Sequence, residues 1–207
     1  HFCLSRGLGD VYKRQGLRGV DGNPSIRLSW NGDERTSRVC ILAADGSTVT
    51  LAGGADGFAD GRGEAARFNK PDGMAMGPDG RLYITDTNNH SIRCVDREGN
   101  VSTVAGRPCE EDEEPESIDG DAATALFNNP NAVAVASDGT IYVGEREGRR
   151  VRQIRDGAVS TICECEDGVH GLFLDDGLLY ATEGHRILTV VVPTLMQQLQ
   201  VRFAPIL

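Results

Sequence analysis

The chain has 207 residues, including 26 glycines, with 39% hydrophobic and 5% aromatic residues and a formal charge of −10. This acidic balance disfavours nucleic acid as a partner, because a phosphate backbone repels an acidic surface. No apolar run approaches the roughly 20 residues that cross a membrane, and residues 1–15 lack the apolar stretch of a signal peptide. The six cysteines are too sparse for a disulfide framework, which favours a reducing, cytoplasmic compartment.

The first part of the chain contains an incomplete unit. Residues 1–15 match no part of the repeat, and we expect residues 1–20 to be a non-native or disordered leader, with a native N-terminal extension as the alternative for 1–15. Within the segment 21–192, the apolar runs Val39–Leu42 and Val49–Gly53 flank the pair Asp45-Gly46. An Asp-Gly pair between apolar runs is typical of a β-hairpin, because both residues tolerate positive φ. We therefore predict a partial sheet near 38–52.

Two long copies of one pattern follow. Three positions of the first copy recur 59 residues later (127 − 68), namely Phe68, Pro71 and Tyr83 as Phe127, Pro130 and Tyr142. Each copy contains short apolar runs separated by Asp-Gly pairs, which predicts antiparallel strands rather than helices. Between the copies lies the acidic run Glu110–Glu116, which we predict to be a solvated surface loop.

A third, shorter copy completes the pattern. His170–Leu174, Asp176–Tyr180 and His185–Ile187 keep the same order but lack the lead-in that carries Phe and Pro. We predict four-stranded antiparallel sheets at about 74–104, 133–162 and 171–192, and an irregular tail at 193–207. Alternating apolar residues such as Met74 and Met76 are expected to be buried between the sheets.

The repeated segments resemble a known family. Leu82–Arg93 resembles the core of an NHL repeat, and Gly57–Gly61 with Ala65–Pro71 resembles the lead-in of its longer variety. The resemblance covers residues 38 to about 190 and implies an all-β fold, a six-bladed β-propeller. About three to three and a half four-stranded blades fit in this chain, so we expect an incomplete propeller. The second copy departs from the family at Arg149, where His is preferred.

One series of polar residues precedes the innermost strand of each blade. Asp72, Asn131 and His170 align at this point, and stacking of the blades would bring them to one mouth of the central channel. Their oxygen and nitrogen atoms could bind a divalent metal or a polar ligand. The alternative is that Asp and Asn only cap the turn before the strand.

Other polar residues recur in a way that indicates a structural role. The acids Asp86, Glu145 and Glu183 each end a second strand, and His90 and His185 share one position of the repeat. One catalytic site needs one acid and one base, so copies in every repeat favour a structural hydrogen bond over catalysis. The pair Cys163 and Cys165 has no second ligand pair at zinc spacing, so free thiols are expected there.

Two functions remain open. The resemblance implies a non-catalytic scaffold that binds a protein or a ligand, without a cofactor. The alternative is a metal-dependent hydrolase or lyase of the gluconolactonase-like or peptidyl-hydroxyglycine lyase-like class, with a site at the channel mouth and a divalent metal. We expect a protein partner, no nucleic acid and no membrane.

Overall fold

The computed structural model describes residues 16–17, 25–31, 35–43, 45–109, 115–175 and 177–192. Regular structure in these ranges consists of short strands and two 3-10 turns, η1 (Gly63–Ala65) and η2 (Thr87–Asn89). The prediction of an all-β chain is confirmed. Most of the expected leader, the acidic residues 110–114 and the tail 193–207 lie outside the described residues. No helix in the described part is long and apolar enough to cross a bilayer.

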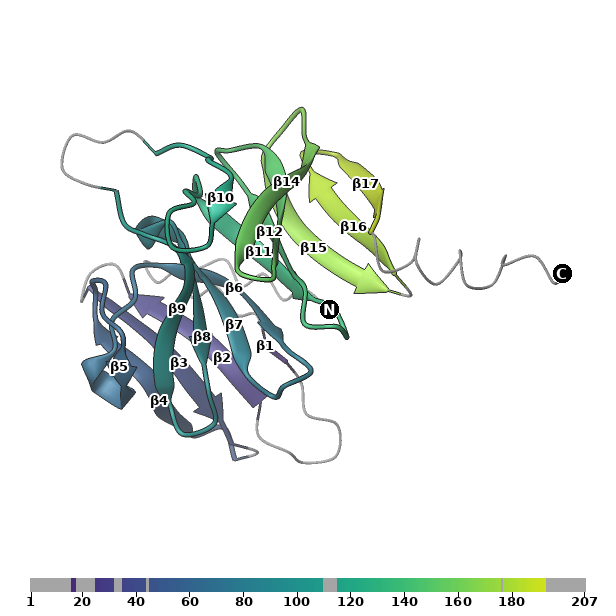
Figure 1. Cartoon of the computed structure of the whole chain (residues 1–207). Helices are drawn as coiled ribbons and strands as arrows, with labels where there is room; N and C mark the ends of the chain where they lie inside the picture. The colour runs from purple at the N-terminus through teal and green to yellow at the C-terminus, as the bar shows by residue number, and fades with distance from the viewer. Residues whose placement is uncertain are drawn as a thin grey trace, which may run out of the picture.

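The strands form four antiparallel sheets, which we call blades 1 to 4 (Figure 1). Blade 1 contains β1 (Gly16–Leu17), β2 (Ser25–Asn31), β3 (Thr36–Leu42) and β4 (Thr48–Ala55). Blade 2 contains β5 (Gly61–Arg62), β6 (Pro71–Met76), β7 (Leu82–Asp86), β8 (Ser91–Val95) and β9 (Asn100–Gly106). Blade 3 contains β10 (Gly120–Asp121), β11 (Pro130–Val135), β12 (Ile141–Glu145), β13 (Arg150–Arg155) and β14 (Ala158–Glu164). Blade 4 contains β15 (Val169–Asp175), β16 (Leu178–Glu183) and β17 (Arg186–Val191).

The blades stack around a common axis. β11 contacts both β6 and β15, so the innermost strands of blades 2, 3 and 4 lie side by side around the axis, in chain order (Figure 1). This is the arrangement of a β-propeller. Blade 1 is more complete than predicted, because β1 and β2 add to the sheet near 38–52.

The Asp-Gly hairpins form as predicted. Gly80 and Gly139 have φ values of 75° and 87°, which a side chain would strain. Asp79 accepts a hydrogen bond from the N–H of Arg81 at 3.1 Å, and Asp138 accepts one from Thr140 at 3.0 Å. Each turn is thus fixed by its own side chain, which sets the register of the flanking strands.

Apolar cores fill the three interfaces between blades. Each combines alternate residues from two sheets, and the first two also contain small and aromatic residues of a lead-in. The first includes Leu28, Val39, Phe68 and Ile84, the second Ile92, Phe127, Val133 and Val143, and the third Tyr142, Val151, Leu179 and Ala181. Met74 is buried as predicted, but Met76 is 42% exposed, because it ends β6 beside the hairpin, where the strand leaves the core.

Two lead-in segments add a fifth strand that the sequence analysis did not predict. β5 pairs with the outer strand β9, and β10 pairs with β14. Each lead-in therefore crosses the outer edge of its blade before the chain enters the innermost strand. This crossing buries Phe68 and Phe127 in the interfaces between blades.

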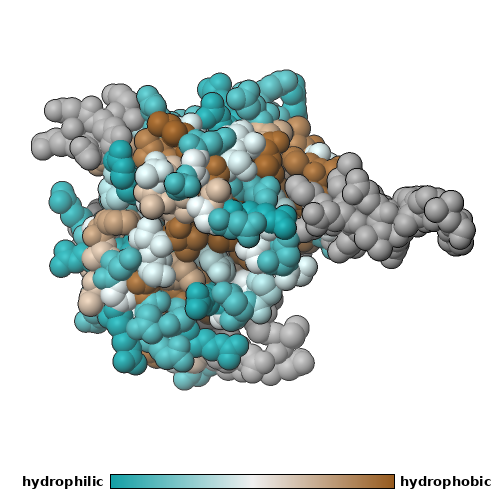
Figure 2. All heavy atoms as spheres, in the orientation of Figure 1, coloured by the Kyte–Doolittle hydropathy of each residue, from teal (hydrophilic) through white to brown (hydrophobic). Residues whose placement is uncertain are grey.

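Blade 4 presents one apolar face to solvent. Its other face, with Leu172, Leu179 and Leu188, packs against blade 3. On the open face Phe173, Ile187 and Val191 are 64%, 71% and 52% exposed. Figure 2 shows apolar atoms gathered over the sheet β15–β17. Within the described residues, no second sheet packs on this face.

Ile92 and Ile187 form a matched pair for testing this arrangement. Each pairs with the residue just before the acid that ends the second strand. However, Ile92 is fully buried and Ile187 is exposed. We expect Ile92→Ala to lower the free energy of unfolding by about 2–5 kcal/mol and Ile187→Ala by less than about 0.5 kcal/mol, as urea titration would measure. Equal losses of unfolding free energy in the two variants would contradict the placement of Ile92 between two blades and of Ile187 on the open face of blade 4.

Candidate functional site

The three aligned residues Asp72, Asn131 and His170 all lie at β-bulges. The register slips between Pro71 and Met74 in β6, between Pro130 and Ala132 in β11, and between Val169 and Gly171 in β15. A bulge turns the extra residue out of the normal alternation and re-aims its side chain. The repeat therefore carries one irregularity at the same point of each innermost strand.

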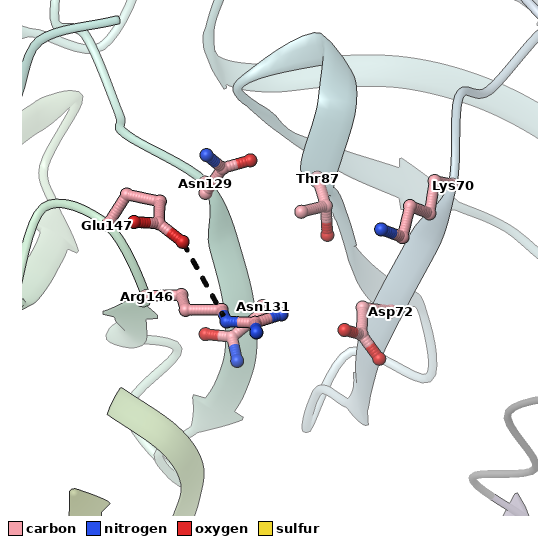
Figure 3. Close-up of a pocket in the computed structure, with 7 residues that line it drawn as sticks. All are labelled: Lys70, Asp72, Thr87, Asn129, Asn131, Arg146 and Glu147. Atoms are coloured by element: carbon pink, nitrogen blue, oxygen red, sulfur yellow. Dashed lines mark ion pairs between the residues drawn. The ribbon is translucent and has the colours of Figure 1, made fainter. Parts of the chain in front are cut away.

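Two of these three residues meet at a polar cavity of about 250 Å³. The walls come from the starts of β6 and β11, from η2 and from the loop between β12 and β13. The lining residues are Lys70, Asp72, Thr87, Asn129, Asn131, Arg146 and Glu147. Figure 3 shows Lys70 and Asp72 extending from the β6 side, and Asn131 and Arg146 from the β11 side, toward the same space. The lining has no aliphatic or aromatic side chain, so the cavity suits a polar ligand.

Backbone contacts set the distance between the two walls. A Cβ on Gly73 would lie 2.6 Å from the carbonyl oxygen of Asn131, so only glycine permits this approach. Thr87 Oγ1 donates a hydrogen bond of 2.7 Å to the carbonyl of Pro130. The first contact brings β6 close to β11, and the second joins η2 to the start of β11.

His170 lies at the equivalent bulge of β15, but it is exposed and does not line the cavity. No group of three or more His, Cys, Asp or Glu side chains among the described residues has the spacing to hold a metal ion. His170 therefore does not join Asp72 and Asn131 at this cavity. Cys163 and Cys165 carry free thiols, and burial raises the pKa of Cys165 to about 12.

In blades 2 to 4 the acid at the end of the second strand binds the backbone of the segment that precedes the innermost strand. Asp86 Oδ1 accepts the N–H of Asn69 at 2.7 Å, and Glu145 Oε1 accepts that of Asn128 at 2.9 Å. In blade 4, Glu183 Oε2 accepts the N–H of Glu166 at 2.9 Å. These hydrogen bonds fix the chain as it enters the innermost strand.

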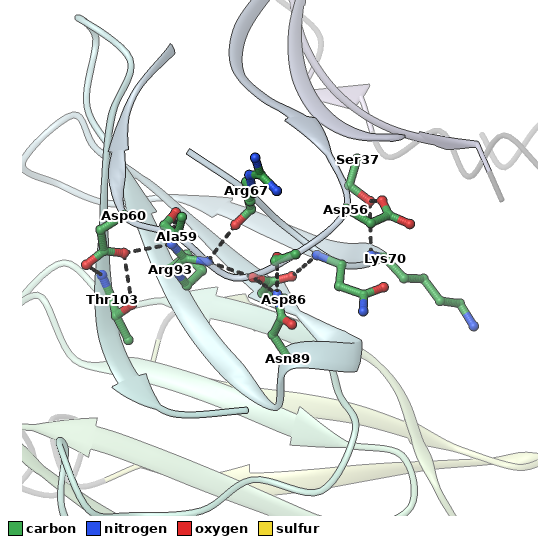
Figure 4. A network of polar contacts seen from close by, with 12 residues as sticks. Ser37, Asp56, Ala59, Asp60, Arg67, Lys70, Asp86, Asn89, Arg93 and Thr103 are labelled. Carbon is green, nitrogen blue, oxygen red and sulfur yellow. Dashed lines mark hydrogen bonds and ion pairs between the residues drawn. The ribbon is translucent and has the colours of Figure 1, made fainter. Parts of the chain in front are cut away.

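In blade 2 a buried arginine joins this acid to a second one (Figure 4). Arg93 Nη1 lies 2.8 Å from Asp86 Oδ2, and Arg93 Nη2 lies 2.7 Å from Asp60 Oδ1. Arg93 also donates to the carbonyls of Arg67 and Ala59. We call the set Asp60, Asp86 and Arg93 the acid–arginine clamp of blade 2. One end of the guanidinium binds Asp86 in the sheet, and the other end binds Asp60 in the lead-in.

Blade 3 repeats this clamp and blade 4 lacks it. Arg152 Nη1 lies 2.9 Å from Glu145 Oε1, and Arg152 Nη2 lies 2.6 Å from Asp119 Oδ1. In blade 4, Leu188 takes the register position of the arginine. Since Arg152 is fully buried, Arg149, Arg150 and Arg152 do not form a basic surface patch, although they lie close together in the sequence.

His90 and His185 have different environments. His90 is buried in a left-handed conformation with φ 50°, and its Nδ1 accepts the N–H of Asn129 at 3.3 Å. Ser37 makes the corresponding contact in blade 1, where its Oγ accepts the N–H of Lys70 at 3.1 Å. His185 is exposed in the shorter turn of blade 4. His90 thus joins blade 2 to the entry of blade 3.

The acids of the clamps differ in their pKa. Burial raises the pKa of Asp86 to about 6, despite the hydrogen bonds from Asn89, Asn69 and Arg93. Burial also raises the pKa of Glu145. For Asp60 and Asp119, burial acts in the same direction, but hydrogen bonds from arginine and threonine outweigh it and lower the pKa. The inner acid of each clamp therefore holds its proton more tightly than the outer one.

We expect Arg93→Leu to lower the free energy of unfolding by about 3–5 kcal/mol, because it leaves Asp86 buried without its cation. Adding Asp86→Asn should recover part of this loss, since the uncompensated charge is gone. A double-mutant cycle in urea measures this coupling. Additive losses from the two changes would contradict the clamp.

The raised pKa values predict how stability depends on pH. Asp86 binds its proton more tightly in the folded chain, so its contribution is full below its ordinary pKa of about 4 and is lost as pH rises through about 6. The urea midpoint should therefore increase when pH falls from 7 to 5. This increase should shrink in Asp86→Asn, and the remainder reflects Glu145. A midpoint that falls over this range in the wild-type chain would contradict the assignment.

Comparison with known proteins identifies the family. The model of the Teneurin NHL domain family matches residues 34–155, more than half of the chain. The chain belongs to this family. Human Teneurin-4 is 36% identical over 92 residues, which cover 40% of this chain and 3% of that protein. Chicken NHL repeat-containing protein 2 is 39% identical over 71 residues, which cover 33% of this chain and 10% of that protein.

The solved structure of a streptogramin B lyase is similar in fold. It superposes with a TM-score of 0.54 at 17% identity, over 87% of this chain and 55% of the lyase. This chain therefore spans about half the length of the lyase and a small part of Teneurin-4 and of NHL repeat-containing protein 2. The NHL-repeat β-propeller expected from the resemblance is confirmed.

Five of the seven residues that line the cavity were not predicted from the sequence. Lys70 and Asn129 stand two positions before Asp72 and Asn131, across a proline, and this shared spacing could have indicated them. Thr87, Arg146 and Glu147 carry no repeat signal, because they come from turns that differ between blades.

Proposed function

We propose that the chain is part of a non-catalytic NHL propeller that binds a protein partner at the channel mouth between β6 and β11. The observation that supports this most is that the ionisable residues fall into two groups, those that hold the blades together and those that line the cavity. The recurring acids and arginines are bound within the clamps, whereas the cavity gathers polar groups on a rigid rim. Rigid strands that carry binding groups on their ends and turns are the usual design of a recognition surface.

The charges at this mouth give the surface its specificity. Lys70 and Arg146 lie beside the carboxylates of Asp72 and Glu147, so the rim has both signs within a chain of strongly negative charge. Such a surface selects a partner by complementary placement of charge rather than by apolar area.

Selection of phage-displayed peptides on the 207-residue chain tests this function. The double variant Asp72→Asn/Arg146→Gln removes charge from the mouth. Asp79→Asn/Arg81→Gln is the matched control, because it removes an exposed acid–arginine pair at 3.7 Å from the hairpin end of the same sheet. We expect the selected peptides to bind the wild type and the control, and to lose at least about tenfold in affinity for the mouth variant.

Peptides that bind the mouth variant as well as the wild type would contradict the proposal. Divalent-metal-dependent cleavage of a lactone or ester by the chain, abolished by His170→Ala, would replace it with the hydrolase or lyase alternative. Thermal unfolding of all variants confirms that each remains folded.

A further inference from the structure

We propose that the cavity between β6 and β11 binds a small zwitterion of the α- or ω-amino-acid class, with its ammonium group at Asp72 and Asn131 and its carboxylate at Lys70 and Arg146. The proposal rests on the channel mouth being the binding surface and names the chemistry that it recognises. It deepens the proposed function, and its test is independent of the peptide selection.

The size and lining of the cavity limit the ligand. Its volume of about 250 Å³ is below the roughly 300–1,000 Å³ of pockets for drug-sized molecules. All seven lining side chains are polar or charged, so burial of apolar surface cannot provide the affinity. The ligand must therefore be small and must bind through hydrogen bonds and charge.

Asn131 indicates a donor group on the ligand. The residue is 6% exposed, it lines the cavity, and its Oδ1 has no hydrogen-bond donor. A buried acceptor without a donor costs about 1–3 kcal/mol, which a ligand N–H would relieve. The carboxylate of Asp72 lies on the opposite wall, also at a bulge (Figure 3). An acceptor on each wall suits a primary ammonium group with its three donors.

The cations indicate an acceptor group on the same ligand. Lys70 and Arg146 reach the cavity from opposite walls (Figure 3). Arg146 lies 3.8 Å from Glu147, and both side chains are more than half exposed, so this ion pair is weak and a ligand carboxylate can compete with it. With two cations and two carboxylates in the lining, a neutral ligand with both charges fits better than an ion of either sign.

The identity of residue 70 supports a role for its side chain. Lys70 has φ 54°, and Asn129 has φ 51° at the equivalent position of blade 3. Asn tolerates this left-handed conformation better than Lys does. The sequence has 19 arginines and two lysines, yet one of these lysines occupies this position at the rim. Conformational preference alone would favour Asn, and Lys at this position places an ammonium group at the rim of the cavity.

NMR titration of the 207-residue chain tests the proposal. The probes are glycine, β-alanine and γ-aminobutyrate, which carry both charges at increasing separation, with acetate and ethanolamine as single-charge references. We expect at least one zwitterion to shift the Asn131 side-chain amide and the Gly73 backbone amide saturably, at least about tenfold more tightly than either reference.

Variants connect binding to the two walls. Lys70→Asn keeps a residue that suits the backbone and removes the ammonium group, and Asp72→Asn removes the carboxylate. Each should weaken zwitterion binding at least about tenfold, whereas Arg97→Asn, an exposed arginine in the β8–β9 turn, should not.

Three results would overturn the proposal: no saturable shift with any probe, equal binding of acetate or ethanolamine, or unchanged binding in Lys70→Asn and Asp72→Asn. If mouth-dependent peptides are selected but no zwitterion binds, the binding scaffold stands and only the ligand class is wrong. If zwitterions bind but no peptide depends on the mouth, the ligand class stands and the protein partner is wrong.

Discussion

A buried guanidinium between two carboxylates is the interaction on which the two complete blades depend. Arg93 and Arg152 are fully buried, and each joins the acid of its second strand to an acid of its lead-in. Without the arginine, a buried carboxylate would have no cation, and without the acids a buried cation would have no anion. The clamp therefore requires the lead-in to follow one path over the blade, and this path determines where the innermost strand begins.

The start of the innermost strand is also where the cavity forms. The inner acid of the clamp binds the N–H of Asn69 in blade 2 and of Asn128 in blade 3, one residue before Lys70 and Asn129. The chain then passes through a left-handed residue, a proline and a bulge, in the same order in both blades. The structural repeat thus brings equivalent atoms to equivalent places. Each wall of the cavity carries one cation and one carboxylate, Lys70 with Asp72 and Arg146 with Glu147.

The repeat made most of the fold predictable. The spacing of Phe68, Pro71 and Tyr83 and the Asp-Gly pairs predicted the strands and hairpins, because local turn chemistry and alternation determine them. Strands β5 and β10 were not predictable, since each is two residues long and depends on a contact with a distant strand. The alignment of Asp72 with Asn131 indicated part of the cavity. Arg146 and Glu147 reach it only through the stacking of blades, which no local pattern encodes.

The lead-in strands also show where one structural module ends and the next begins. The segment from Asp56 to Lys70 follows β4 of blade 1 and packs against it, but its hydrogen bonds to Arg93 and Asn89 and the pairing of β5 with β9 attach it to blade 2. A unit that can be transplanted whole therefore runs from Asp56, just after β4 of blade 1, to Gly106 at the end of β9. A graft that began at Pro71 would carry Arg93 into its new host without Asp60. A crossover point that precedes the lead-in keeps Asp60 and Arg93 together.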